Sequence, residues 1–125
     1  MTLDFGTCGV YGHTATLEDK ETELKTRVQI NVKNQEWEIS DWHSSIKHKG
    51  YGTITLCSLC RHLLMIGYPL PTRVTYIWNG ANEYVLASLE RQFDAKCIRA
   101  DNGSDDSWDA HIYELNVDKF IAVMV

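Results

Sequence analysis

The sequence predicts an α+β domain in which a mostly antiparallel sheet carries two helices packed on one of its faces. Short runs that alternate apolar and polar residues, at both ends of the chain, are typical of half-buried strands. Two stretches between them, 55–67 and 85–93, repeat apolar residues at helical spacing. Because the strands gather at both ends around two helices, this class is favoured over an alternating, doubly wound fold.

The best supported strands form a hairpin in the first third of the chain. Residues 28–32 alternate apolar with polar side chains, and 33–35 have the composition of a turn. Residues 36–39 then continue with Trp37 and Ile39 on one face. Two such runs joined by a short polar turn predict an antiparallel pair.

Other strands are predicted from weaker patterns. The glycine-rich segment 6–12 does not define a strand. Short strands are expected, in chain order, at 13–17, 74–78, 97–100, 112–115 and 120–125. Segment 41–52 shows no periodicity and is interpreted as a loop. The predicted order along the chain is therefore β-β-β-α-β-α-β-β-β.

The first predicted helix has a broad apolar stripe that runs from Leu56 to Ile66. Thr55 is placed at its start and Gly67 at its end. A stripe of this width predicts a helix buried against the sheet.

The pair Cys57 and Cys60 falls on that stripe and is interpreted as core packing, since cysteine behaves as a small hydrophobe. A zinc site is the alternative left open. Its other ligands would be one of two pairs, Cys8 with His13 or His43 with His48. No metal is predicted, because a second well-spaced ligand pair is missing.

At 125 residues the chain has the size of one domain, and 1–125 is predicted to fold as one unit. Hydrophobic residues make up 44% and charged residues 23%, as in ordinary globular proteins. No signal-peptide pattern opens the sequence, and no apolar run approaches the roughly 20 residues that span a bilayer. No membrane association and a cytoplasmic location are therefore expected, with the four cysteines as reduced thiols.

The net charge of −5 argues against direct binding of nucleic acid. Affinity for phosphate backbones depends on lysine and arginine, and the richest basic stretch, 47–49, is short and isolated. The acidity favours a protein partner instead, in particular a basic or nucleic-acid-binding protein.

The candidate binding site is the acidic loop that begins after residue 100. Carboxylates beside an exposed aromatic ring are the composition of a patch that docks a basic partner. The predicted contact residues are Asp101, Asp105, Asp106, Trp108 and Asp109. Calcium is not predicted, because the spacing does not match an EF-hand. A solvated surface loop is the alternative.

These observations favour a small protein-binding module over an enzyme. It would be an inhibitor, an immunity protein or an anti-defence accessory protein that covers its partner's surface, with no cofactor. No Gly-x-Ser-x-Gly elbow and no Gly-x-x-x-x-Gly-Lys or Gly-x-Gly-x-x-Gly phosphate loop occurs. The alternative is a small enzyme or ligand-binding domain that uses the Asp41–Gly52 loop, with His43 as acid or base.

Overall fold

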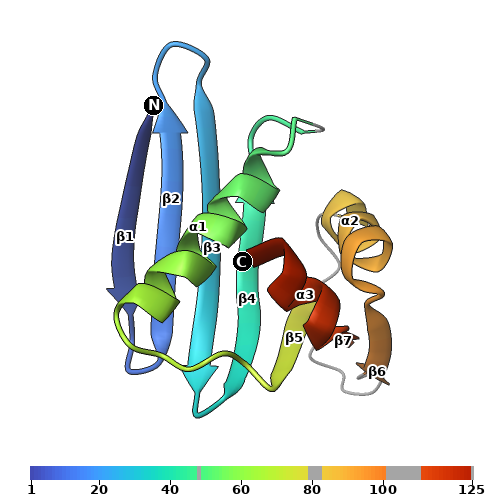
Figure 1. Ribbon diagram of the computed structural model, residues 1–125. Coiled ribbons are helices and arrows are strands. Elements are labelled where there is room, and N and C mark those ends of the chain that lie inside the picture. The colour runs from blue at the N-terminus through green and yellow to red at the C-terminus, as the bar shows by residue number, and fades with distance from the viewer. Residues whose placement is uncertain (48, 79–82, 101–110, 125) are drawn as a thin grey trace, which may run out of the picture.

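The computed structural model describes residues 1–47, 49–78, 83–100 and 111–124, which form one sheet and three helices (Figure 1). The mixed α+β class is confirmed. The elements, in chain order, are β1 (Thr2–Cys8), β2 (Gly12–Asp19), β3 (Leu24–Lys33), β4 (Glu36–Ser44), α1 (Tyr51–Met65), β5 (Arg73–Trp78), α2 (Glu83–Phe93), β6 (Lys96–Ala100), β7 (His111–Leu115) and α3 (Val117–Met124).

The sheet has seven strands in the order β1-β2-β3-β4-β5-β7-β6. Every neighbouring pair is antiparallel except β4 and β5, which are parallel and are joined by α1. A parallel pair needs such a crossover, because its two strands run in the same direction. The mostly antiparallel sheet is thus as predicted, with one parallel pair at its centre.

β4 and β5 pair only over part of their length. Their register runs from Glu36 opposite Arg73 to Ile39 opposite Tyr76 and stops there. At the same place the register between β3 and β4 shifts, so that Ser40 has no partner on β3. A bulge of this kind bends a strand and increases its twist. Beyond Ile39, β4 therefore continues along β3 but parts from β5.

The core lies between the sheet and the helices that cover it. α1 contacts β2 and β3, and α3 lies beside α1 over the same face (Figure 1). Leu59, Cys60 and Leu63 of α1 are fully buried, which agrees with the interpretation of Cys60 as core. Cys57 is only half-buried, and its thiol lies 3.8 Å from the carbonyl oxygen of Val123. Within the described ranges, no three metal-ligating side chains cluster together.

Two sequence predictions about the helices and the loop are wrong. There are three helices in the described chain, not two, because 120–125 was predicted as a strand and Val117–Met124 forms α3. The Asn116 side chain caps this helix by accepting from the Lys119 N–H at 3.0 Å, and Phe120 and Met124, four residues apart, are both buried. The predicted 41–52 loop is also shorter, since β4 extends to Ser44 and α1 begins at Tyr51.

None of the helices in the described part of the chain is long and apolar enough to cross a bilayer.

Candidate active site

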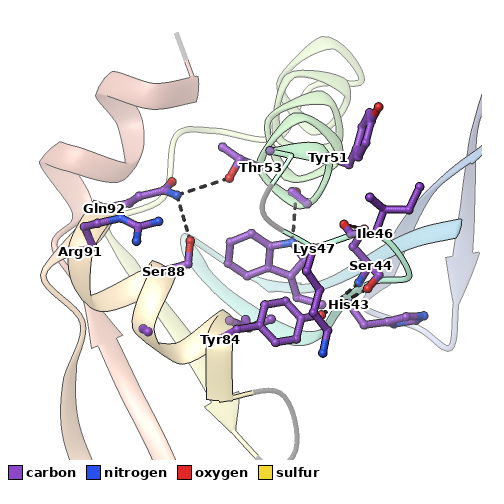
Figure 2. Close-up of a pocket in the computed structure, with 15 residues that line it drawn as sticks. His43, Ser44, Ile46, Lys47, Tyr51, Thr53, Tyr84, Ser88, Arg91 and Gln92 are labelled. Carbon is purple, nitrogen blue, oxygen red and sulfur yellow. Dashed lines mark hydrogen bonds between the residues drawn. The ribbon is translucent and has the colours of Figure 1, made fainter. Parts of the chain in front are cut away.

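A cavity of about 340 Å³ opens where β4 ends, against the first turn of α1 and one side of α2 (Figure 2). It lies beyond the last paired residues of β4 and β5. Its lining residues are Trp42, His43, Ser44, Ile46, Lys47, Gly50, Tyr51, Gly52, Thr53, Tyr84, Val85, Ala87, Ser88, Arg91 and Gln92. No aspartate or glutamate is among these described residues, although the chain carries 17 acidic side chains. The cavity is therefore a locally basic place in an acidic protein.

The start of α1 presents backbone N–H groups to this cavity. Gly50 precedes the helix with a φ of 77°, a left-handed conformation that favours glycine. No side chain caps the helix start, and its first turn holds no acidic residue. The first N–H groups of a helix have no partner within the helix and carry its positive dipole end. With Lys47 and Arg91 on the cavity wall, they make a site that suits an anion.

Trp42 fixes the position of this helix start. Its indole Nε1 donates to the carbonyl oxygen of Gly52 at 3.0 Å, and the indole is almost fully buried. A Cβ on residue 52 would lie 2.8 Å from that same nitrogen, so only glycine lets the helix approach the ring this closely. The end of β4 and the beginning of α1 are thus held in contact by one side chain.

We expect Trp42→Phe to lower the free energy of unfolding more than Trp37→Phe does. Both changes remove the same volume from a buried indole, but Trp37 Nε1 has no acceptor among the described residues, whereas Trp42 Nε1 has Gly52. The extra cost of losing that hydrogen bond is about 1 kcal/mol. Urea unfolding of the two variants measures the difference. Equal destabilisation of both would show that the Trp42–Gly52 bond does not support the site.

α2 is tied to the same region by polar contacts. The Tyr84 hydroxyl lies 3.4 Å from both the nitrogen and the oxygen of the Ser44 backbone. Lys47 Nζ lies 4.6 Å from the centre of the Tyr84 ring, within range of a cation–π interaction. Farther along α2, Gln92 donates to Ser88 at 3.0 Å and reaches Thr53 of α1 at 3.5 Å. These contacts hold the two walls of the cavity together (Figure 2).

His43 is at the cavity's edge, with its imidazole pointing away from Lys47 and Tyr84 (Figure 2). Its neighbour Trp42 is buried on the helix side of β4, so His43 extends from the opposite face. Its Nδ1 lies 3.5 Å from one carboxylate oxygen of Asp41, and Arg27 Nε lies 3.5 Å from the other. A carboxylate at Nδ1 favours the tautomer that leaves Nε2 open to accept a proton.

Tyr76 occupies the last pairing position before β4 and β5 separate. Burial raises its pKa to about 12, with smaller contributions from the nearby Asp41 and Tyr84. Its hydroxyl is therefore protonated at neutral pH and can act as a hydrogen-bond donor.

The structure brings together two residues that the sequence singled out, and the other predicted site residues fall outside its described part. His43 and Lys47, both from the Asp41–Gly52 region that the alternative hypothesis named, line one cavity. The signal that could have found the site is the lysine at 47 followed by Gly50 and Gly52 before a helix. The predicted contact loop (Asp101, Asp105, Asp106, Trp108 and Asp109) lies outside the described residues.

Comparison with solved structures finds this fold among acetyltransferases. A protein assigned to the GNAT acetyltransferase family from Desulfovibrio desulfuricans gives a TM-score of 0.60 at 14% identity, over 86% of this chain and 70% of that chain. The ribosomal L7/L12 alpha-N-protein acetyltransferase RimL, solved with coenzyme A, gives 0.57 at 14% identity, over 86% and 64%. Arabidopsis thaliana NAA60, solved with a bisubstrate analogue, gives 0.56 at 12% identity, over 86% and 77%. Such low identities establish similarity of fold alone.

No family model matches the sequence, and a search of curated proteins finds no match.

These similarities contradict the prediction of a protein-binding inhibitor with a basic or nucleic-acid-binding partner. Several of the similar structures are described as acetyltransferases or as an acyl-CoA N-acyltransferase. The prediction was wrong because it relied on the net charge of the whole chain, whereas the cavity gathers basic and neutral side chains locally. The alternative, an enzyme or ligand-binding domain that uses the region from Asp41 to Gly52, agrees better with the findings.

Proposed function

We propose that this chain binds an acyl-coenzyme A in the cavity at the end of β4 and transfers the acyl group to an amine. The observation that carries the proposal is a cavity at a helix N-terminus, placed where β4 parts from β5, whose described lining residues include Lys47 and Arg91 and no carboxylate. The fold supports it, since RimL shares this fold and was solved with coenzyme A.

We also propose that α2 shares the face covered by α1 and α3, because it contacts α3.

The phosphates of coenzyme A would lie at the start of α1. Backbone N–H groups of the first turn, the ammonium of Lys47 and the guanidinium of Arg91 are all donors, and none of the described lining residues is a carboxylate that would repel an anion. Thr53, Ser88 and Gln92 add neutral donors on the same walls. This donor set fits a pyrophosphate.

The pantetheine arm would run into the gap between β4 and β5. Beyond Ile39 the side of β4 that faces β5 is not paired with it, so backbone groups of β4 are available to the two amides of the arm. An extended chain that carries two amides along its length can add to such an edge as a short strand does. The arm would then direct the thioester toward Ser40 and Tyr76, where the sheet opens.

Proton transfer would involve His43. When bound, the acyl thioester supplies an electrophilic carbonyl, and an attacking amine must lose a proton. His43 Nε2 can accept that proton, since Asp41 occupies the Nδ1 side and Arg27 holds Asp41 in place. Because the imidazole extends from the face opposite to α1, the amine would approach from that face. Tyr76 is protonated at neutral pH and can stabilise the leaving thiolate by donating a hydrogen bond to it.

A titration with coenzyme A tests the binding step. Trp42 lines the cavity, so binding should change tryptophan fluorescence in a saturable way. Lys47→Ala and Arg91→Ala should each weaken binding about 10-fold, because one hydrogen bond to a charged group contributes at least about 1.5 kcal/mol. Both side chains are solvent-exposed, so the loss should shrink in high salt.

Lys20→Ala is the matched control for that titration. It removes the same charge from an exposed turn residue far along the chain from the cavity, and binding should stay within a factor of two of the unmodified protein. Two results would contradict the proposed site. One is an equal loss of affinity in Lys20→Ala. The other is no saturable signal at ~1 mM coenzyme A, the weak end of specific binding.

A further inference from the structure

The two edges of the sheet differ in how well they are protected against pairing with another strand. β6, at one edge, has five residues, includes the exposed Lys96, and has an irregular register between Cys97 and Arg99. Short length, basic side chains and bulges are the devices that keep edge strands from associating. β1, at the other edge, has none of them.

β1 is a regular strand of seven residues whose register with β2 is unbroken from Thr2 to Cys8. It contains no lysine, arginine or proline, and its one charge is Asp4. All seven residues are exposed. Its outer side therefore presents a full row of backbone N–H and C=O groups with no partner in the described chain.

We propose that β1 pairs with β1 of a second copy of this chain, antiparallel, so that two sheets join into one. A strand of seven residues has its centre at Phe5, and a two-fold axis through Phe5 is the only antiparallel register that pairs all seven. In this register Thr2 lies opposite Cys8 of the second copy, and Asp4 lies opposite Gly6. No carboxylate faces another carboxylate, whereas a shift by one residue along each strand would place Asp4 opposite itself.

The side chains on this strand support the same pairing. Leu3 and Phe5 extend to the helix-covered face, since they lie opposite Leu17 and Ala15 of β2, which are buried. They are nevertheless 39% and 40% exposed. Phe5 stacks on His62 of α1 with ring centres 4.1 Å apart, so its position is fixed before any partner arrives. In the joined sheet the two Phe5 rings would be direct cross-strand neighbours, a favourable aromatic pair.

The interface lies at the opposite edge of the sheet from β6, with β2 and β3 between it and the end of β4 (Figure 1). Association through β1 therefore leaves the cavity open. The dimer and the proposed coenzyme A site can be tested separately, because neither uses residues of the other.

Disulfide cross-linking with Thr2→Cys tests both the dimer and its register. Thr2 and Cys8 of one chain are about 20 Å apart along a strand, too far for a disulfide within the chain. Across the proposed interface they are direct neighbours. Under mild oxidation, Thr2→Cys should give a covalent dimer on a non-reducing gel, and the added change Cys8→Ser should abolish it. The unmodified protein, with its other cysteines intact, sets the background.

Light scattering on the unmodified protein should give twice the 14.3 kDa chain mass. Phe5→Lys should give a folded monomer, because the two lysines would face each other across the interface and repel. Cooperative urea unfolding of Phe5→Lys shows that it is folded. Three results would each overturn the proposal. The first is a monomeric unmodified protein at about 100 μM, a concentration at which even a weak homodimer would form. The others are the absence of a cross-link in Thr2→Cys and a cross-link that survives the added change Cys8→Ser.

Discussion

His43→Gln is expected to reduce turnover by about 100- to 10,000-fold while affinity for coenzyme A stays unchanged. The range is the usual contribution of a positioned general base. Glutamine keeps the size and polarity of the side chain but cannot take up a proton. Since the imidazole points away from Lys47 and Tyr84, its loss should not disturb the wall that we assign to the phosphates (Figure 2).

The measurement is the rate of thiol release from acetyl-coenzyme A with the best acceptor from a panel of primary amines. His62→Gln is the matched control, because His62 stacks on Phe5 and lies outside the cavity lining. It should retain the turnover of the unmodified protein. Unchanged turnover in His43→Gln, or a loss that appears only in the affinity for coenzyme A, would remove His43 from the proton-transfer step.

Phe120→Ala is expected to lower the free energy of unfolding by about 3–5 kcal/mol, the usual range for removing a fully buried aromatic ring. Phe120 is 2% exposed, packs edge-on against Trp37 at 6.5 Å between ring centres, and meets Phe93 of α2 at 5.4 Å. A domain of this size is stable by roughly 5–15 kcal/mol, so this one change can unfold much of the protein.

Val123→Ala on the same helix is the control. Its side chain is 39% exposed, and a surface change of this kind costs within about 0.5 kcal/mol. Urea unfolding of both variants gives the comparison. If Phe120→Ala lowered the free energy of unfolding by less than about 1 kcal/mol, the position would behave as unpacked. That result would show that α3 does not close the core between the sheet and α2.

The hairpin of β3 and β4 and the body of α1 could be predicted because each is determined by local periodicity. Val28, Ile30 and Val32 alternate over β3, and all three are buried. Leu56, Leu59 and Leu63 repeat along α1 and are buried as well. In these segments one face of the element meets the core, so the pattern in the sequence and the burial in the structure coincide.

α3 was missed because its sequence favours a strand locally. Isoleucine and valines at 121, 123 and 125 suggest β structure, and the decisive features lie elsewhere. Asn116 caps the helix start, and Phe120 finds Trp37 and Phe93, which come from distant parts of the chain. Tertiary packing and a cap thus overrode intrinsic propensity.

The cavity could be predicted only in part. In the sequence, the region from Asp41 to Gly52 indicates a site only as the alternative, because its glycines suggest a loop and its lysines form a short, isolated stretch. Arg91, forty-four positions after Lys47 in the sequence, joins the site only because α2 packs against the end of β4. The parting of β4 and β5 depends on a bulge at Ser40 that no residue pattern in the sequence indicated.

Amide chemical-shift mapping with coenzyme A shows residue by residue whether the cavity binds this ligand. We expect saturable shifts for the amides of Lys47 and Gly50–Thr53, for the Trp42 indole N–H, and for the α2 residues that line the cavity, with β1 and β2 unchanged. The same shifts should weaken together in Lys47→Ala. Shifts that are absent, or that gather on β1, β2 or the face of the sheet away from α1, would contradict coenzyme A binding at this cavity.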